Sequence, residues 1–207
     1  MKVCIVLNGE VKNYSKTKEI IVNENYDYII AADGGCNHLY KMNITPDYII
    51  GDLDSVDEEV ISYYKSKNVL LKKYPTHKDE TDSEICIYLA KELKANQVDF
   101  IGSLGGRIDH TLANIGLMYY VKNMNIEPRI LNSEEEILII KDEEITIKGE
   151  VGNTVSIISI MVFRFSSWFA FILSTYTSKS DQTPSSSSKA KEQSSIKSKN
   201  SLLGSFS

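Results

Sequence analysis

The first 125 residues alternate between short apolar runs, rich in β-branched residues, and longer stretches in which apolar residues recur at helical spacing. Continuous apolar runs are typical of strands covered on both faces, and strand–helix alternation favours a mostly parallel sheet with helices on its faces. We therefore predict an α/β fold for this part. The predicted strands are 3–7, 28–32, 48–51, 69–73 and 98–102, and the clearest predicted helices are 57–67, 83–94 and about 110–122.

The rhythm of the sequence changes after Ile126. Strand-like runs now follow one another without intervening helices, namely PRILN, EEILIIK, EITIKG and NTVSIIS. Short strands at this spacing indicate the start of a small antiparallel β domain over 126–160. We place the boundary between the two domains near Asn125.

The composition changes once more over residues 161–207. An apolar and aromatic run ends near Tyr176, and the Ser- and Lys-rich residues beyond it bury too little apolar surface to offset the entropy of ordering, so we expect disorder there. We favour an altered reading frame or a fusion as the origin of this part. Two other interpretations are a membrane segment at Ile157–Tyr176, which Arg164 interrupts, and one or two ordered strands followed by a natural tail.

The charge of the chain is unevenly distributed around a formal net value of −5. Six basic and two acidic residues lie from Arg164 onward, so the remainder carries −9. Such an acidic body excludes duplex nucleic acid as a partner. The three cysteines, Cys4, Cys36 and Cys86, lack metal-type spacing, and the N-terminus lacks the long apolar run of a signal peptide. We therefore expect reduced thiols and a cytoplasmic protein.

Four segments that carry acidic residues or glycines each follow a predicted strand. Ligands of open α/β sheets gather at the carboxyl ends of strands, so this shared placement matters more than any single motif. In the first segment, Asp33 precedes Gly34 and Gly35, which let the backbone turn sharply and approach a ligand. Taken alone, the same residues also fit a common tight turn in which Asp33 caps a helix.

The second segment places Asp52 and Asp54 two residues apart. In an extended segment both side chains point to the same side, which suits two oxygen ligands of Mg²⁺. A local alternative is a capping box from Ser55 to Glu58 that begins the helix 57–67. The capping box explains Ser55 and Glu58 but gives no role to Asp52 and Asp54.

The third segment, KDETD at 78–82, opens the next predicted helix, and its alternative is again a capping box, from Thr81 to Glu84. A third acidic cluster at a third strand end nevertheless favours a metal, because carboxylates that face one cleft repel each other unless a cation neutralises them.

The fourth segment, GSLGGRIDHTLAN at 102–114, is a glycine-rich loop that runs into a predicted helix. Backbone N–H groups and the helix dipole present positive charge to an anion, and Arg107 could clamp a phosphate. The alternative is a simple entry to a helix with Asp109 as N-cap and His110 as an exposed residue of the first turn. No nucleophile–His pair or zinc spacing stands out, so the chemistry indicated is Mg²⁺-assisted transfer at phosphorus.

Together, ADGG-C-N, PDYIIGDLDS, KDETD and GSLGGRIDHTLAN, in this order and at these separations, resemble the catalytic domain of thiamine pyrophosphokinases over residues 1 to about 125. More weakly, TVSIIS resembles the early strands of that family's thiamine-binding β-sandwich. The resemblance implies Mg²⁺-dependent transfer of a pyrophosphoryl group from ATP to thiamine, which gives thiamine diphosphate and AMP. It also implies a homodimer whose thiamine site lies between one subunit's catalytic domain and the partner's sandwich.

The resemblance also implies roles for individual residues. Asp52, Asp54 and Asp82 would hold Mg²⁺, with Asp33 and Asp79 nearby. Asp109 is the candidate for activating or orienting the thiamine hydroxyl and completes the expected catalytic set. The implied ATP-binding residues are Asp33, Gly34, Gly35, Asn37, Lys78, Gly105, Gly106, Arg107, His110 and Asn114.

The chain beyond Ile160 carries no pattern of this family, so the implied sandwich is incomplete. An incomplete antiparallel sheet has open edges and an exposed apolar face, and we expect poor solubility or weak activity as a result. Two other functions stay open: a catalytically impaired module that binds nucleotide and Mg²⁺, and a different Mg²⁺-dependent phosphoryl or nucleotidyl transferase on the same α/β core. None of these functions requires a membrane.

Overall fold

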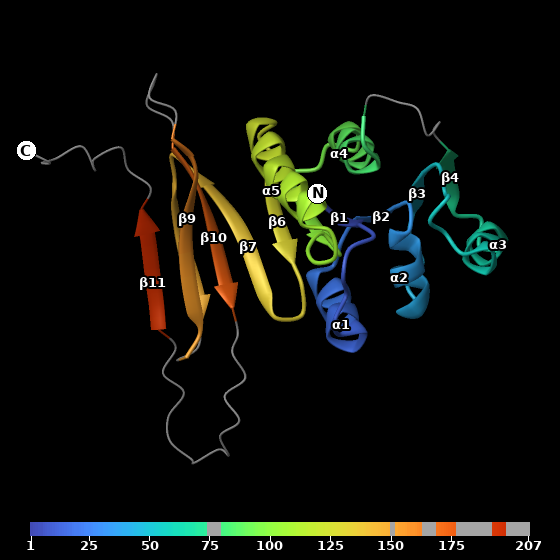
Figure 1. The fold of residues 1–207 in the computed structure, drawn as a ribbon, viewed down its shortest axis with the longest axis horizontal. Helices are drawn as coiled ribbons and strands as arrows, with labels where there is room; N and C mark the ends of the chain where they lie inside the picture. Colours follow the sequence, from blue (N-terminus) through green and yellow to red (C-terminus); the bar gives the residue numbers. More distant parts are fainter. Residues whose placement is uncertain (74–79, 150–151, 163–168, 177–191, 198–207) are drawn as a thin grey trace, which may run out of the picture. The chain divides into compact units, whose positions relative to one another are not determined.

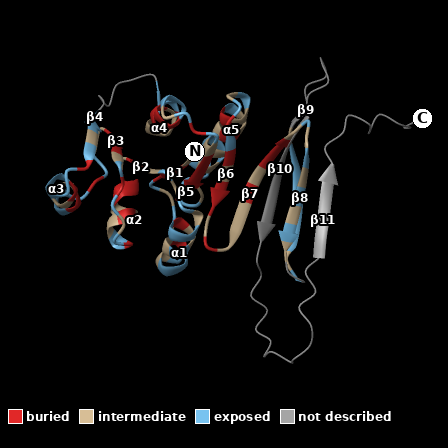
Figure 2. Ribbon diagram, turned by 180° about the vertical axis from the view of Figure 1, so that it is seen from behind, coloured by how far each residue is buried: buried red, intermediate tan, exposed pale blue. Residues whose placement is uncertain are grey.

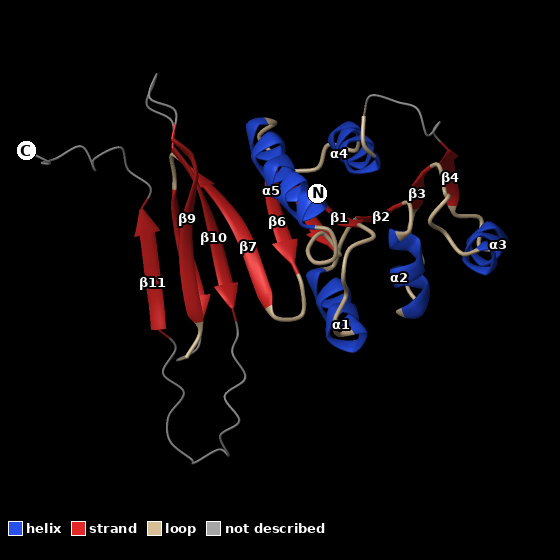
Figure 3. Ribbon diagram, in the orientation of Figure 1, coloured by secondary structure: helices blue, strands red, loops and turns tan. Residues whose placement is uncertain are grey.

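The computed structural model of the chain describes residues 1–73, 80–149, 152–162, 169–176 and 192–197. Its contacts divide the chain into two compact units, Met1–Ser133 and Glu134–Ser207. The first unit alternates strands with helices, whereas the described part of the second contains strands (Figures 1 and 3). The α/β class predicted from the sequence is confirmed, with strands of a following β region.

The first unit is built on a fully parallel sheet in which the strand order is β4-β3-β2-β1-β5-β6. The chain adds strands outward from β1 to β4 and then returns to place β5 on the other side of β1, so the strand order reverses between β1 and β5. The strands are β1 Lys2–Val6, β2 Tyr28–Ala32, β3 Tyr48–Gly51, β4 Leu70–Lys73, β5 Gln97–Ile101 and β6 Glu127–Leu131.

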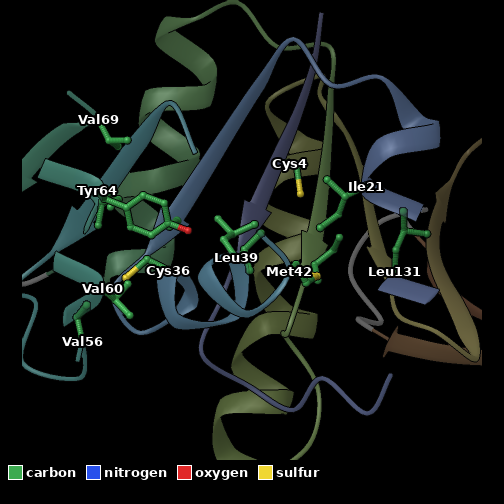
Figure 4. Close-up of a cluster of buried hydrophobic side chains, with 14 residues drawn as sticks. Cys4, Ile21, Cys36, Leu39, Met42, Val56, Val60, Tyr64, Val69 and Leu131 are labelled. Carbon is green, nitrogen blue, oxygen red and sulfur yellow. The ribbon is translucent and has the colours of Figure 1, made fainter. Parts of the chain in front are cut away.

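Helices cover both faces of this sheet. The helices are α1 Tyr14–Glu24, α2 Gly35–Lys41, α3 Glu58–Ser66, α4 Asp82–Glu92 and α5 Ile108–Asn123. One face packs against the first three helices, whose Ile21, Leu39 and Tyr64 join Cys4 of β1 and Ile49 of β3 in a single buried cluster (Figure 4). The other two helices lie on the opposite face in Figure 1.

The central strands carry the core, as their almost uninterrupted apolar runs predict. Val3, Ile5 and Phe100, on β1 and β5, are at most 2% exposed (Figure 2). The edge strand β4 departs from this expectation, because Leu70 is 58% exposed. An edge strand has a neighbour on one side only, so its apolar residues are less completely covered.

A buried carboxylate at the amino-terminal end of the sheet is neutralised by a ring of donors. Asp99 of β5 is fully buried, and Arg129 of β6 donates from Nε to its Oδ1 at 2.8 Å and from Nη2 to its Oδ2 at 2.5 Å. Tyr26 donates its hydroxyl to the same carboxylate at 2.7 Å, and Gln97 donates its amide at 3.0 Å. Glu24 pairs with Arg129 at 2.9 Å, so the cluster ties α1 to β5 and β6.

The second unit contains two sets of antiparallel strands. In the first, β10 Phe169–Tyr176 lies between β7 Glu135–Lys141 and β9 Thr154–Val162. In the second, β8 Glu144–Gly149 pairs with β11 Glu192–Lys197.

Two expectations about the end of the chain change. Residues 192–197, predicted to be disordered, form a strand, because pairing with the edge of β8 uses backbone groups and needs no apolar side chains. The candidate membrane segment contains the end of β9 and all of β10, which pair with each other, and no helix in the described ranges is long and apolar enough to cross a bilayer. The remainder of the predicted disordered tail lies outside the described residues.

One strand also changes its partner. The PRILN run, predicted to begin the antiparallel domain, forms β6, which pairs in parallel with β5. The long helix α5 supplies the crossover that a parallel pair requires, and β6 therefore belongs to the first unit.

The buried carboxylate predicts a large cost for losing its partner. Arg129→Met leaves the Asp99 carboxylate buried without its main counter-charge, and we expect the free energy of unfolding to fall by about 3 kcal/mol or more. Urea denaturation followed by circular dichroism measures this loss. Adding Asp99→Leu to the same chain removes the stranded charge and should restore most of the stability. Equal midpoints and slopes for wild type and Arg129→Met would contradict the prediction.

Candidate functional site

A cavity of about 850 Å³ lies at the carboxyl ends of the strands, where the strand order reverses. This is the position at which open α/β sheets bind their ligands, because loops leaving adjacent strands in opposite directions open a crevice. Its walls come from the loops after β1, β2 and β5 and from the first turns of α4 and α5.

The loops after β1 and β5 are locked together by main-chain hydrogen bonds. Leu7 N–H donates to Ile101 O at 2.8 Å, Gly9 N–H to Gly102 O at 2.6 Å, and Glu10 N–H to Leu104 O at 2.8 Å. Gly102 has φ +65°, and a side chain there would collide with the carbonyl oxygen of Leu7. The cavity therefore has a wall made of closely apposed backbone that only glycine permits.

Residues 8–10 line the cavity and are absent from the residues expected to form the site. Asn8 and Gly9 follow the first apolar run directly, just as the four acidic and glycine-rich segments follow theirs. The rule that placed those segments at strand ends could therefore have found this loop as well. Ser55 and Ser103 also line the cavity, and nothing in the sequence singled them out as ligand-binding residues.

Three carboxylates converge beside the cavity. Oxygen atoms of Asp33, Asp52 and Asp54 lie within 4.8 Å of one another, and Asp33 also lines the cavity. Asp33 follows β2 and the other two follow β3, which is the parallel neighbour of β2. Adjacent parallel strands thus bring together two sequence segments about twenty residues apart, as their placement at strand ends predicts.

Asp52 and Asp54, which follow β3, come together through a turn of the backbone and not along an extended segment. Leu53 has φ +68°, a conformation that is uncommon for a branched residue, and Asp54 N–H donates to Asp52 Oδ1 at 3.2 Å. The alternative interpretation, a capping box from Ser55 to Glu58, is wrong: Asp57, not Ser55, is the N-cap of α3, and it makes no side-chain capping bond. The two aspartates are therefore positioned by a strained turn that the side-chain spacing alone did not reveal.

Asp33 offers a carboxylate oxygen that fits a cation. Its Oδ1 is buried and has no hydrogen-bond partner, and its backbone has φ +46°. An unpaired buried carboxylate oxygen close to two further carboxylates is costly unless a positive charge is bound. Mg²⁺ prefers such hard oxygen ligands and commonly takes one or two carboxylates together with phosphate oxygens. The donor set is therefore suited to Mg²⁺.

Asp82 lies elsewhere on the cavity wall. It is the first residue of α4, and Thr81 before it forms the predicted capping box with Glu84, whose backbone N–H donates to Thr81 Oγ1 at 3.2 Å. Asp82 lines the cavity but is not part of the three-carboxylate group found among the described residues. Lys78 and Asp79, expected at the same site, lie outside the described residues.

The glycine-rich loop after β5 supplies the opposite wall. Gly105 and Gly106 line the cavity with φ +79° and +67°, and Asn114 of α5 donates to the Ser103 carbonyl at 2.8 Å. The buried Ser103 hydroxyl oxygen has no partner and is available to a ligand. The start of α5, where a helix carries unpaired N–H groups and the positive end of its dipole, therefore lies at the cavity, with Arg107 and His110 in its lining.

Arg107 and Asp109 form an exposed ion pair at this helix start. Arg107 Nε donates to Asp109 Oδ1 at 3.1 Å, and the side chains are 70% and 59% exposed. Arg107 lines the cavity, as does His110, whereas Asp109 is not among the described lining residues. Hydrogen bonding to Arg107 lowers the pKa of Asp109. The suggested N-cap role of Asp109 is wrong, because Arg107 occupies the N-cap position.

Gly34, Gly35 and Asn37 are not among the described residues that line the cavity. A side chain at Gly35 would collide with the carbonyl of Val6, and one at Gly34 would collide with the Asn8 amide, so both glycines allow α2 to approach β1 closely. Asn37 bonds to the loop after β3. Its Nδ2 donates to Ser55 O at 3.1 Å, and its Oδ1 accepts from Asp57 N–H at 3.3 Å.

The cysteines offer no reactive thiol at the site. All three are buried and form no disulfide, and burial followed by the negative charge of Asp33 raises the pKa of Cys36 to about 12. A thiol with so high a pKa stays protonated at neutral pH and is a poor nucleophile. The groups at the cavity therefore suit cation and phosphate binding better than covalent catalysis by cysteine.

Comparison with known proteins agrees with this chemistry. The family described as "Thiamin pyrophosphokinase, catalytic domain" matches residues 21–130, a range that contains the three carboxylates and the glycine-rich loop. The chain belongs to the thiamin pyrophosphokinase family.

Relatives within the family align over its catalytic part. Thiamine pyrophosphokinase of Bacillus subtilis is 30% identical over 121 residues, which is 58% of this chain and 56% of the relative. Thiamine pyrophosphokinase 2 of Oryza sativa is 32% identical over 118 residues, which is 47% of this chain and 44% of the relative. The chain thus spans about half the length of the curated relatives it matches.

Crystal structures of thiamin pyrophosphokinases share the fold over a longer range. The Bacillus subtilis structure superposes with a TM-score of 0.69 at 20% identity, covering 86% of this chain and 100% of that one. The Candida albicans structure gives 0.70 at 16% identity, covering 86% and 89%. The structural likeness therefore extends beyond the 21–130 range of the family match.

The cavity wall predicts different costs for two glycine substitutions in the family's glycine-rich loop. Gly102→Ala and Gly106→Ala each place a side chain at a φ near +66°, which costs about 1 kcal/mol. Only the first also collides with a backbone carbonyl, whereas nothing lies within 4 Å of a side chain at the second. Urea unfolding should show a loss for Gly102→Ala at least twice that for Gly106→Ala. Equal losses would contradict the close approach of the two loops.

His38 contacts the loop after β1 that forms part of the cavity wall, and its burial predicts that the free energy of unfolding depends on pH. The Gly9 carbonyl can only accept, so His38 Nε2 donates to it at 2.8 Å, and Tyr14 OH donates to Nδ1 at 2.8 Å. Burial lowers the pKa of His38 below its usual 6.5, so folding favours the neutral ring. Its contribution to stability is complete above about pH 6.5 and declines as the pH falls through the lowered pKa.

The measurement compares wild type with His38→Gln, which keeps an amide donor for the Gly9 carbonyl but cannot titrate. The difference in free energy of unfolding should be largest at about pH 7.5 and should shrink by about pH 5. A difference that stays constant over this range would show that His38 does not titrate between the folded and unfolded states.

Proposed function

We propose that the chain transfers a pyrophosphoryl group from ATP to thiamine, giving thiamine diphosphate and AMP, in a Mg²⁺-dependent reaction. The observation that carries the proposal is the three-carboxylate group beside a cavity whose other wall is a glycine-rich loop at a helix start. Relatives that match this region are named thiamine pyrophosphokinases. We also propose that the protein acts in the cytoplasm, which its three free cysteines support.

The acidic residues supply the cation site in this proposal. Asp33, Asp52 and Asp54 would hold Mg²⁺, and Asp82, which lines the cavity at the start of α4, would supply a further carboxylate. Bound Mg²⁺ neutralises charge that develops on the phosphate oxygens during transfer. The carboxylates would also hold the cation next to the loop that binds the phosphates, so the cation and the phosphates would meet in the same cavity.

The glycine-rich loop binds the phosphates. Gly105 and Gly106 line the cavity before the start of α5, where backbone N–H groups would bind phosphate oxygens, and Arg107 provides a positive charge on the cavity wall. The Ser103 hydroxyl, which is buried and unpaired, offers one further polar contact. These groups orient the nucleotide and stabilise its negative charge, which is the principal catalytic task in phosphoryl transfer.

Asp109 takes a different role from the one that the resemblance implied. In the reaction the thiamine hydroxyl oxygen forms a bond to the β-phosphorus, the bond from that phosphorus to the AMP oxygen breaks, and the hydroxyl proton leaves. Asp109 is paired with Arg107, and this pairing lowers its pKa, which weakens it as an acceptor of that proton. We therefore assign Asp109 to holding Arg107 at the cavity entrance.

A second candidate is a nucleotide- and Mg²⁺-binding protein with impaired catalysis. Its support is the surface of β9, where Val155, Ile157 and Ile158 are 40–55% exposed. Exposed apolar residues on a strand indicate an interface or an aggregation-prone surface.

A homodimer, which we propose as the active form, would cover apolar surface of this kind.

The products formed from ATP distinguish these functions. Thiamine-dependent release of AMP supports the pyrophosphokinase, and ATP binding without AMP supports the impaired module. ADP or pyrophosphate as the product would indicate a different Mg²⁺-dependent transferase on the same core. Light scattering after size-exclusion chromatography measures the mass of the active species, and a monomer with full turnover would contradict the homodimer.

The cation site gives a direct mutational prediction. Asp52→Asn and Asp54→Asn each remove a carboxylate charge, and we expect thiamine-dependent AMP release to fall by about 100-fold or more while the circular dichroism spectrum is unchanged. Glu58→Gln, which changes an exposed acid at the start of α3, is the matched control and should keep wild-type turnover. Near-normal rates in both aspartate variants would refute the cation assignment.

A further inference from the structure

Asn37 joins the two segments that carry the acidic residues. It lies on α2, four residues after Asp33, and its amide contacts the loop that follows β3. Its Nδ2 donates to the carbonyl of Ser55 at 3.1 Å, and its Oδ1 accepts from the N–H of Asp57 at 3.3 Å. Both functional ends of the amide are thus engaged by protein, on the carboxyl-terminal side of Asp52 and Asp54.

The carboxylates themselves favour separation of these segments. Three negative charges with oxygens within 4.8 Å of one another repel, and the repulsion is strongest when no cation is bound. Asp33 N–H donates to Ile50 O at 2.7 Å, which anchors the segments where β3 ends. Beyond that point, bonds from Asp54 to Asp52 and from Val56 to Leu53 shape the loop internally, Val56 packs in the same buried cluster as Leu39 of α2, and the Asn37 amide adds hydrogen bonds to this packing.

We propose that Asn37 is a positioning residue that holds the Asp52–Asp54 turn against Asp33 and thereby sets the affinity of the acidic group for a divalent cation. The inference rests on the proposed function, because it assumes that the three carboxylates bind Mg²⁺. It replaces direct nucleotide contact, the role that the family resemblance implied for Asn37, with support of the cation site.

A purely structural role makes a different prediction. If Asn37 only joined α2 to α3, its removal would lower stability and leave cation affinity unchanged. Alanine is the better helix former, so Asn37→Ala favours α2 locally and should leave the unit folded. If Asn37 positions the turn, the variant keeps the apolar packing of Val56 but loses the hydrogen bonds that set the turn's distance from Asp33, and affinity for the cation falls.

The experiment measures binding of Mn²⁺ alone by isothermal titration calorimetry and by electron paramagnetic resonance. Loss of the two hydrogen bonds should weaken Mn²⁺ binding by about tenfold in Asn37→Ala. The matched control is Asn13→Ala, which loses the N-cap bond from Lys16 N–H at 3.0 Å on α1 and so lowers stability without touching the acidic turn. Asn37→Ser, too short to reach both partners, is measured alongside and supplies the result if the alanine variant does not fold.

The outcomes separate the two levels of the proposal. Wild-type affinity in Asn37→Ala and Asn37→Ser, or equal weakening in Asn13→Ala, would overturn the positioning role while leaving the cation site intact. Absence of saturable Mn²⁺ binding in wild type would overturn the cation site and with it the positioning role. Weakening confined to the Asn37 variants, together with a higher Mg²⁺ requirement for AMP release, is the expected result.

Discussion

The close approach of backbone between the loops after β1 and β5 is the constraint on which the site depends. Three main-chain hydrogen bonds join these loops, and Gly102 adopts a φ of +65° against the carbonyl of Leu7. Because the strand order reverses here, the remaining loops diverge and leave a cavity above the joined pair. The cavity exists because the sheet reverses, and the backbone contact gives it a defined wall.

Charge is the second determinant of the site. Three carboxylates converge on one side of the cavity, and the glycine-rich loop with the start of α5 lies on the other. The acids repel one another, and the glycine-rich loop lies at the start of a helix, where the dipole presents positive charge. In the proposed function, a cation bound together with a polyphosphate would neutralise the acids and meet the positive end of α5.

Much of the fold could be predicted from the sequence because strands and helices are indicated by the spacing of apolar residues within each segment. Continuous apolar runs identified β1, β2, β3 and β5, and the capping box at Thr81 correctly marked the start of α4. Errors arose where a long-range contact decided the outcome. β6 joined the parallel sheet through its pairing with β5, and Glu192–Lys197 became a strand through its pairing with β8. Neither partner can be inferred from the composition of the segment itself.

By itself the sequence determined which residue types stand at the strand ends, namely carboxylates after two strands and a glycine-rich loop after a third. The tertiary structure alone decided how those residues combine. It placed Asp33 with Asp52 and Asp54, set Asp82 apart at the start of α4, and engaged the Asn37 amide with the loop after β3. The physical reason is that residue spacing determines which way side chains point only while the backbone is extended. At Leu53 the backbone turns, so the spacing of Asp52 and Asp54 no longer determines where their side chains lie.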